Sequence, residues 1–456
     1  MPSSSTTVIL GAGIAGVSAA YYLSAQYGMK DIILIDDQPP LSLTSDKSTE
    51  CYRNWWPGPG DAMVKFMNHS IDLLEKLARA SGNIFHLNRR GYLYLTADLA
   101  KIPQILFAAR ESASLGGGDL RVHHGKPVDP PYIPSHPSGF EDQPSGADLI
   151  LDPAIIRKYY PYISENTVAA LHARRAGWFS AQQLGAFLLE HARRNGVQTI
   201  QDRVVEINIG ANRVTGVRLS TGSRINCSNL VIAAGPYLKQ AGQMLGLDLP
   251  VYCELHLKVA FKDYLGVVPR HAPLLIWTDA QNLPWSAEEQ SFLKEEANTR
   301  WLLGEFPSGV HTRPEGGDDS PIALMLWEYR TEKVEPRFPP PIDPDYPEIA
   351  LRGLATMLPA LSAYFGKAPR PVLDGGYYTK TRENRPLISP LPVEGTFVIG
   401  ALSGYGLMAS QAAGELIAAY VTHQTLPDYA QAFDLRRYQN PDYQELLTRW
   451  GSSGQL

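Results

Sequence analysis

A glycine turn that follows an apolar strand can hold a phosphate, and one such turn lies near the start of this chain. It reads Gly11-Ala12-Gly13-Ile14-Ala15-Gly16, after the apolar run 8–10 and before a segment rich in helix-forming residues. A second apolar run, 32–35, is followed by Asp36 and Asp37. Strand, glycine turn, helix and a second strand that ends in an acid make the pattern of a dinucleotide-binding βαβ unit.

Each residue type in this pattern has a physical reason. Gly11 permits the tight turn, Gly13 lets the backbone approach a pyrophosphate, and Gly16 lets the helix pack closely on the strand. The start of the helix offers N–H groups to the phosphates, and Asp36 is placed to accept hydrogen bonds from a ribose. An ordinary strand–turn–helix is the alternative, but the flanking strands and the acid favour a dinucleotide site.

Composition narrows the class of protein. The chain has 456 residues, 44% of them hydrophobic, which is enough for a large core. Its net charge of -5 offers no basic field for nucleic acid or for an acidic membrane surface. No apolar run approaches the roughly 20 residues that span a bilayer, and no basic segment precedes the first strand. We therefore expect a cytoplasmic protein with no membrane span and no nucleic-acid partner.

Cys51, Cys227 and Cys253 show no CxxC spacing. Without that spacing a zinc site or a disulfide framework is not expected, and the three residues are interpreted as structural thiols. The sequence predicts no metal site.

Further elements must position the glycine turn. Apolar residues at three- and four-residue spacing predict a helix over 61–80, and alternation predicts a strand at 204–209 followed by a hairpin over 214–227. Other predicted elements are buried strands at 230–236 and 396–400, a glycine-rich turn at 403–406, a helix at 408–421, and an irregular Pro-, Gly- and Ser-rich segment at 125–146.

Four landmarks in this order resemble the flavin-dependent amine and amino-acid oxidase superfamily, which contains monomeric sarcosine oxidase, glycine oxidase and D-amino-acid oxidase. They are GAGIAG at 11–16, LVIAAGPY at 230–237, TRENRPLI at 381–388 and GALSGYGLMASQAAGELIA at 400–418. The resemblance covers nearly the whole chain and is weakest at 100–150 and 263–345. It implies FAD rather than NAD, a choice that the glycine spacing leaves open.

Carried over position by position, the resemblance implies which residues bind FAD. The adenine lies against backbone after Val204, the pyrophosphate also contacts the loop 45–49, and the flavin pyrimidine edge faces the turn 404–406. The implied cofactor residues are Gly11, Ala12, Gly13, Ile14, Ala15, Gly16, Asp36, Asp37, Ser45, Lys47, Ser48, Thr49, Val204, Ala234, Gly235, Gly400, Gly404, Tyr405, Gly406, Leu407 and Met408.

Three departures from sarcosine oxidase are informative. Gly376 stands where that enzyme carries a cysteine bonded to the flavin, so noncovalent FAD is expected. Met408 replaces a lysine that helps to hold the substrate carboxylate, and Met325 aligns with a lysine that promotes reaction with oxygen. These changes leave the substrate and the electron acceptor open.

The resemblance also suggests residues for the substrate. Arg53 follows Thr49 by four residues, the spacing of a carboxylate-binding arginine in sarcosine oxidase, although pairing with Asp46 or Glu50 is the structural alternative. The predicted catalytic set, which includes residues that would line the pocket, is Arg53, Tyr378, Tyr405 and Trp327. Weaker candidates are Arg382 and Arg385, whereas His86, His191 and His256 are interpreted as structural.

The expected fold is an α/β protein with a Rossmann-like parallel-sheet FAD domain and an antiparallel-sheet substrate domain. The FAD domain is predicted to combine 1–90, 153–250 and 366–456. The substrate domain is predicted to combine 91–152 and 251–365, and the substrate would bind between the two domains.

The expected function is FAD-dependent oxidation of the C–N bond of an amino acid or secondary amine. Hydride transfer to flavin would give an imine that hydrolyses, and oxygen would reoxidise the flavin to give hydrogen peroxide. The alternatives are a dehydrogenase that passes electrons to another carrier, a non-catalytic flavoprotein, and NAD-dependent chemistry without flavin. The oligomeric state is not predicted.

Overall fold

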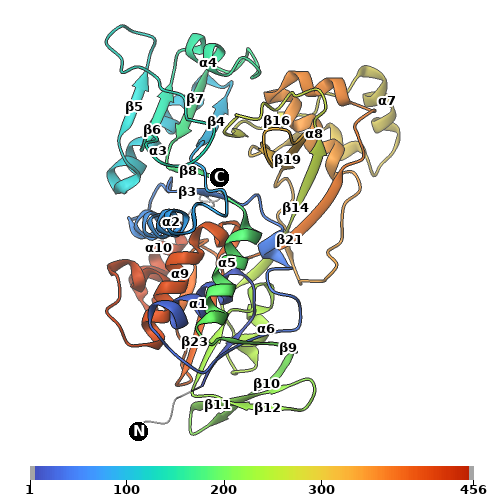
Figure 1. The fold of residues 1–456 in the computed structure, drawn as a ribbon. Coiled ribbons are helices and arrows are strands. Elements are labelled where there is room, and N and C mark those ends of the chain that lie inside the picture. The colour runs from blue at the N-terminus through green and yellow to red at the C-terminus, as the bar shows by residue number, and fades with distance from the viewer. Residues whose placement is uncertain (1–5, 451–456) are drawn as a thin grey trace.

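The computed structural model describes residues 6–450 and contains a parallel sheet at its base (Figure 1). The predicted first βαβ unit is present, because β1 (Thr7–Leu10) pairs in parallel with β2 (Ile32–Asp36), and α1 (Ile14–Tyr21) connects them. The strand order is β22-β23-β13-β1-β2-β9, with only β22 antiparallel to its neighbour. The other four strands are β9 (Gln198–Gln201), β13 (Asn229–Ile232), β22 (Leu387–Pro390) and β23 (Thr396–Gly400).

Four helices cover this sheet and pack on one another: α1, α2 (Ala62–Ser81), α5 (Ala181–Arg194) and α9 (Gly406–Val421). The apolar residues at helical spacing in α2 all point into this core, which is why the sequence pattern located it. The helices α1 and α9 approach closely, since the Ser18 hydroxyl donates to the Ser410 carbonyl at 2.7 Å. A Cβ on Gly414 would lie only 2.3 Å from the Ser18 oxygen.

A small antiparallel sheet extends from the base of the molecule (Figure 1). It contains β10 (Val204–Gly210), β11 (Arg213–Leu219) and β12 (Arg224–Asn226), which are the strand and hairpin that alternation predicts.

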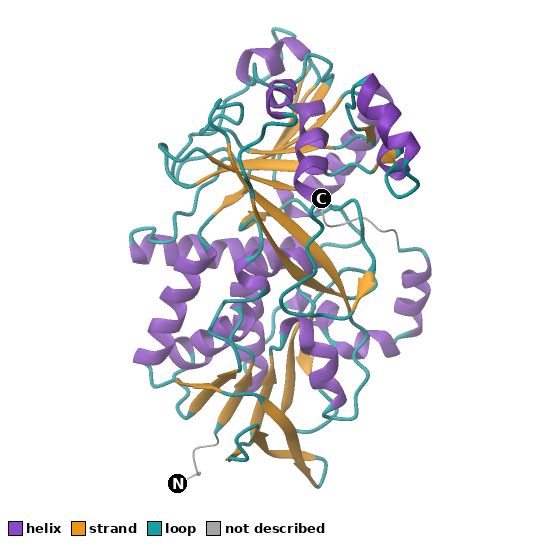
Figure 2. Cartoon of the chain, turned by 90° about the vertical axis from the view of Figure 1, so that its right-hand side faces the viewer, coloured by secondary structure: helices purple, strands orange, loops and turns teal. Residues whose placement is uncertain are grey.

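A ten-stranded sheet forms the upper part of the molecule, and the long strands β14 and β21 reach from it down toward the parallel sheet (Figure 2). Most of its pairs are antiparallel, but β15 and β4 run in parallel, as do β5 and β6. Its strands are β4 (Tyr92–Thr96), β5 (Leu120–His123), β6 (Ala147–Ile150), β7 (Ala169–Ala173), β14 (Tyr252–Lys262), β15 (Leu274–Trp277), β18 (His311–Glu315), β19 (Ile322–Leu326), β20 (Lys333–Val334) and β21 (Val372–Lys380).

The expected α/β fold with two sheets is therefore confirmed. Two strands from segments predicted for the FAD domain, β7 and β21, pair within the upper sheet. The helix α8 (Tyr346–Met357) packs on one face of that sheet, and the opposite face is turned toward the parallel sheet. The remaining elements are β3 (Cys51–Arg53), β8 (Ala176–Trp178), β16 (Gln281–Asn282), β17 (Glu305–Phe306), α3 (Ile102–Ser112), α4 (Pro153–Tyr159), α6 (Leu238–Gln243), α7 (Ala287–Glu295) and α10 (Pro441–Thr448).

Residues 6–450 were compared with the requirements of a membrane-spanning helix and of a metal site. None of their helices has the length and apolar character needed to cross a membrane. They also contain no group of three or more His, Cys, Asp or Glu side chains that could hold a metal ion. The three cysteines are buried free thiols.

Candidate functional site

The glycine turn runs over the carboxyl ends of β1 and β13. Gly11 has a φ of +108°, which favours glycine, and a Cβ there would lie 2.3 Å from the Ala233 carbonyl oxygen. A Cβ on Gly16 would lie 1.9 Å from the carbonyl oxygen of Gly11. The turn therefore needs glycine at both positions for steric reasons.

A cavity of about 420 Å³ opens beside this turn, and Asp36 lies at its edge. The Asp36 carboxylate accepts hydrogen bonds from the backbone N–H groups of Ala12 at 2.6 Å and Gln38 at 2.9 Å. Burial raises the pKa of Asp36, and the two N–H donors oppose that shift because they stabilise the charged form. The predicted cofactor residues that line this cavity are Gly11, Gly13, Asp36, Asp37, Ser45, Val204, Ala234 and Gly235.

A second cavity, of about 90 Å³, continues the first toward β21 of the upper sheet. Both cavities are lined by Gly13, Ser45 and Gly235, so we treat them together as the cofactor groove. The other predicted residues that line the second cavity are Ile14, Ala15, Ser48, Tyr378, Gly400, Gly404, Gly406 and Leu407.

The shape and chemistry of the cofactor groove fit FAD. It is elongated, with Asp36 and Val204 at one end and Tyr378 and Leu407 at the other, as an extended dinucleotide requires. Between the two ends lie the glycine turn and the start of α1, where backbone N–H groups favour a pyrophosphate. The adenosine half would therefore lie by Asp36, and the flavin half would lie by Tyr378.

Some predicted cofactor residues lie beside the groove without lining it. Lys47 forms ion pairs with Asp46 at 2.8 Å and Asp374 at 2.9 Å, and the Thr49 carbonyl accepts a hydrogen bond from Arg313. Met408 is buried in the helical core. The other members of this group are Ala12, Gly16 and Tyr405.

Arg53 is held at the end of β3, which pairs with β8. The side chain is only 4% exposed, and its guanidinium lies 4.7 Å from the Trp56 ring centroid and 5.7 Å from that of Tyr92. Its Nε donates to the Trp55 carbonyl at 3.2 Å. A buried guanidinium stacked on aromatic rings is a preorganised group for binding a carboxylate.

The two acids that the sequence suggests as structural partners of Arg53, Asp46 and Glu50, make the following contacts. Asp46 pairs with Lys47, and Glu50 faces Arg313 at 3.5 Å and accepts the Ala181 N–H at 2.9 Å.

A group of alternating charges surrounds His256 beside Tyr378. His256 stacks on Tyr378 with ring centroids 3.8 Å apart, its Nδ1 lies 3.0 Å from a Glu328 oxygen, and its Nε2 lies 3.3 Å from a Glu254 oxygen. Glu254 also pairs with Lys380 at 2.9 Å. We call these four residues, Glu254, His256, Glu328 and Lys380, the charge cluster.

Both ring nitrogens of His256 thus face carboxylate oxygens, an arrangement that favours the protonated ring over the neutral one. Burial alone would lower the pKa of His256, but the charge of Glu328 and the hydrogen bond to Glu254 outweigh burial and raise it. The structure places His256, which the sequence analysis interprets as structural, beside Tyr378. Burial lowers the pKa of His311 on β18. The charge of Glu328 opposes this shift, whereas the charges of Arg53 and His256 add to it.

Tyr405 and Trp327 have different surroundings. Tyr405 packs edge-on against Trp56, 5.2 Å between ring centroids, and its hydroxyl donates to the Asn384 carbonyl at 2.6 Å. Trp327 lies on the α8 side of the upper sheet, where its indole N–H donates to the Pro307 carbonyl at 3.1 Å. The structure thus brings Arg53, Tyr378 and Tyr405 to one region and leaves Trp327 on the opposite face of the sheet.

The sequence alignment places Met325 where sarcosine oxidase has a lysine that promotes reaction with oxygen, and the structure shows which residues face that side of the sheet. Met325 lies in the same α8-side core as Trp327. Lys258 instead lies on the other face of β14, and its Nζ donates to the backbone carbonyls of Asp46 at 3.3 Å and Ser48 at 3.2 Å. These contacts place the Lys258 amine at the loop beside the cofactor groove. Burial lowers the pKa of this amine.

Sequence reasoning did not single out Glu254 or Lys258 and interpreted His256 as structural, yet a signal for all three exists. They alternate with apolar residues along β14, so they share one face of a strand inside the protein. Buried charges repeated on one strand face are typical of a functional site. By contrast, Arg382 is exposed, and Arg385 lines a separate cavity.

Comparisons with known proteins identify the family of this chain. The sequence model of the family described as "FAD dependent oxidoreductase" matches residues 6–420. Mitochondrial dimethylglycine dehydrogenase from Mus musculus is 21% identical over 443 residues, covering 95% of this chain and 44% of that relative. Sarcosine oxidase subunit beta from Rhizobium meliloti (strain 1021) is 26% identical over 261 residues, 56% of this chain and 54% of that relative.

Solved structures share the fold. L-proline dehydrogenase from P. horikoshii gives a TM-score of 0.72 at 18% identity, over 96% of this chain and 99% of that chain. Glycine oxidase from Geobacillus kaustophilus gives 0.72 at 15% identity, over 95% of this chain and 98% of that chain.

The fold and the cofactor groove thus define an FAD-dependent flavoprotein of two sheets. This chain belongs to the FAD-dependent oxidoreductase family, and its cofactor is FAD. It spans 44% of the length of the mouse dimethylglycine dehydrogenase that it matches.

Proposed function

We propose that this chain oxidises the C–N bond of an amino acid or N-methyl amino acid, giving an imine that water hydrolyses. The observation that carries the proposal is Arg53, a buried guanidinium stacked on Trp56, which itself contacts Tyr405 at the edge of the cofactor groove. The names of the relatives, dimethylglycine dehydrogenase and sarcosine oxidase subunit beta, are consistent with such substrates.

The chain's own residues would bind and orient the substrate. Arg53 would bind the substrate carboxylate through paired N–H donors, and the rings of Tyr92, Trp56 and Tyr378 would exclude water from the reacting carbon. FAD, when bound in the groove, would accept the two electrons removed from the C–N bond. The noncovalent attachment expected from Gly376 is part of this proposal.

The charge cluster limits where the amine proton can go. In this proposal His256, which faces two carboxylates, carries both ring hydrogens and so has no lone pair with which to accept a proton from a substrate ammonium. The substrate amine must be neutral when it reacts, because its nitrogen lone pair assists the departure of the hydride. We expect kcat/KM to rise with pH and to level off above the pKa of the substrate amine.

Oxygen is the proposed electron acceptor, with hydrogen peroxide as its product. Lys258 supports this choice because its amine lies at the loop beside the groove. Met325, which aligns with the oxygen-promoting lysine of sarcosine oxidase, gives no such support because it lies in the core on the α8 side. A dehydrogenase that passes electrons to another carrier is the second candidate, favoured by dimethylglycine dehydrogenase and L-proline dehydrogenase among the relatives and structural neighbours.

The test is an anaerobic titration of the purified yellow protein with L- and D-amino acids, N-methyl amino acids and amines without a carboxylate. We expect carboxylated amines to bleach the flavin band, and the admission of air should restore it within seconds if oxygen is the acceptor. Slow recovery would favour the dehydrogenase. If no compound bleached the flavin, the proposed reaction would be wrong.

Arg53→Gln tests the carboxylate site, with Arg382→Gln as the control because Arg382 is exposed on a turn. Loss of a charge-assisted pair of about 1.5–3 kcal/mol should raise the substrate concentration for half-bleaching by roughly 10- to 150-fold. The control variant should match wild type. Equal bleaching by Arg53→Gln and wild type would remove Arg53 from the site.

A further inference from the structure

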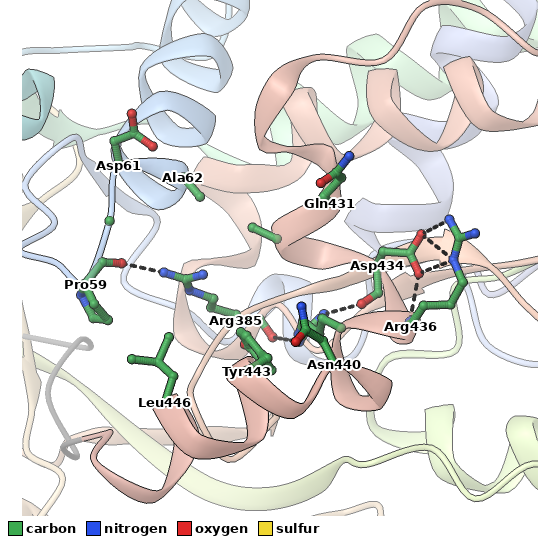
Figure 3. A pocket seen from close by; sticks show the side chains of 13 residues that line it. Pro59, Asp61, Ala62, Arg385, Gln431, Asp434, Arg436, Asn440, Tyr443 and Leu446 are labelled. Atoms are coloured by element: carbon green, nitrogen blue, oxygen red, sulfur yellow. Dashed lines mark hydrogen bonds and ion pairs between the residues drawn. The ribbon is translucent and has the colours of Figure 1, made fainter.

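A cavity of about 650 Å³ lies apart from the cofactor groove and shares no lining residue with it. It is bounded by the start of α2, the turn at 381–385 and the helix α10 (Figure 3). Pro59, Ala62, Ala432 and Leu446 give it an apolar wall, and the other lining residues are mostly polar or charged, including the carboxylates Asp61 and Asp434, which pair with Lys65 and Arg436. The volume falls within the range of small-molecule sites, about 300–1,000 Å³.

Arg385 is the unusual member of this cavity. Its side chain is 8% exposed, and its Nη2 donates to the Pro59 carbonyl at 2.6 Å, a contact drawn in Figure 3. The guanidinium also lies 4.6 Å from the Trp450 ring centroid, while its Nε is buried without a hydrogen-bond partner. Within residues 6–450, no carboxylate forms an ion pair with Arg385.

The other arginines of the cavity have carboxylate partners. Arg436 pairs with Asp434 at 2.6 Å, and Arg437 pairs with the buried Glu383 at 2.8 Å. Figure 3 shows the Asp434–Arg436 pair on the far side of the cavity from Pro59. Among residues 6–450 Arg385 thus has no ion pair of its own, and the nearby Glu383 is already paired with Arg437; a buried cation in this position is costly unless a ligand supplies a counter-charge.

We propose that this cavity is a second ligand site, which binds a small organic anion by pairing its charged group with Arg385. A guanidinium with unused N–H donors matches the two oxygens of a carboxylate or of a phosphate. The apolar wall and the Tyr443 ring would hold the body of the ligand, and the volume exceeds what a bare ion would fill. The ligand is therefore an organic carboxylate or organic phosphate with an apolar body.

The experiment uses crystals of the FAD-loaded protein soaked with 4-bromobenzoate or with 4-bromophenyl phosphate. The anomalous signal of bromine should lie in this cavity, with the charged group on Arg385. Calorimetry with the same probes then assigns the class, since the tighter probe identifies carboxylate or phosphate. Neutral 4-bromobenzamide should bind at least tenfold more weakly. The absence of bromine from the cavity with both probes, or equal binding of the neutral probe, overturns the proposal.

Arg385→Gln should weaken the tighter probe at least tenfold. Arg436→Gln is the matched control, because it removes an arginine from the rim of the same cavity, and it should change the affinity by less than twofold. Similar losses in both variants would overturn the assignment to Arg385.

A ligand-free measurement separates a ligand-binding role from a structural one. Arg385→Met keeps the length of the side chain and removes the unpaired charge, so its melting temperature without ligand should equal or exceed that of wild type. A variant that unfolds or loses FAD would show that Arg385 is required by the fold, and the proposal would be wrong.

Discussion

Replacing His256 with glutamine removes the central cation of the charge cluster. In the wild-type protein the imidazolium serves Glu328 at 3.0 Å and Glu254 at 3.3 Å, whereas a neutral amide carries no charge for either carboxylate. Glu254 pairs with Lys380 at 2.9 Å, and the substitution leaves both of these side chains in place. A double-mutant cycle with Glu328→Gln therefore isolates the interaction between His256 and Glu328.

The size of this interaction follows from its burial. A hydrogen bond between charged groups contributes about 1.5–3 kcal/mol to stability. His256 is buried, but the side chain of Glu328 is 23% exposed, and solvent weakens the attraction. We therefore expect a coupling free energy of about 1.5–2 kcal/mol, near the lower end of that range.

The pH dependence has a defined sign. The pKa of His256 in the folded protein is raised, because the charge of Glu328 and the hydrogen bond to Glu254 outweigh the effect of burial, which alone would lower it. A raised pKa means that the stabilisation is complete below the unfolded pKa of about 6.5 and is lost as the pH rises through the folded pKa. The coupling should thus be largest at low pH and should decline in alkaline solution.

The assay is urea unfolding of the FAD-loaded wild type, both single variants and the double variant, between pH 6 and pH 9.5. The exposed pair Arg213–Glu394, 2.8 Å apart, provides a control cycle, whose coupling should stay below about 1 kcal/mol and should not change over this interval. A His256–Glu328 coupling below about 0.5 kcal/mol at pH 6, or one that grows with pH, would refute the imidazolium assignment.

Three other outcomes follow from the cofactor groove and its border. Gly11→Ala should be purified without yellow colour, because its Cβ would lie 2.3 Å from the Ala233 carbonyl oxygen; a normal ratio of flavin to protein absorbance would contradict this. Asp36→Asn should bind FAD roughly tenfold more weakly, as measured by flavin fluorescence on dilution, since a neutral amide is a weaker partner for a ribose and for backbone N–H donors. Tyr405→Phe should lower the free energy of unfolding by about 1 kcal/mol through loss of the hydrogen bond to Asn384, and unchanged urea unfolding would show that this bond adds no stability.

The sequence by itself determined the cofactor half of this protein, because that half is built from local patterns. The glycine turn 11–16, the apolar strands on either side and the glycine-rich turn at 403–406 each act within a few residues of the chain. Their backbone geometry follows from residue type, so the parallel sheet, α2 and α9 could be predicted, whereas the use of FAD was implied by the resemblance to a flavoprotein family.

Only the tertiary structure decided the substrate side. Period-two alternation indicates that residues on a strand face opposite sides, but it does not say which side meets the cofactor. Trp327 and Met325 therefore lie against α8, whereas His256 and Lys258 lie on the face that meets Tyr378 and the cofactor loop. The pairing of His256 with Glu328 joins residues that are distant in the chain, and burial gives that pairing its strength.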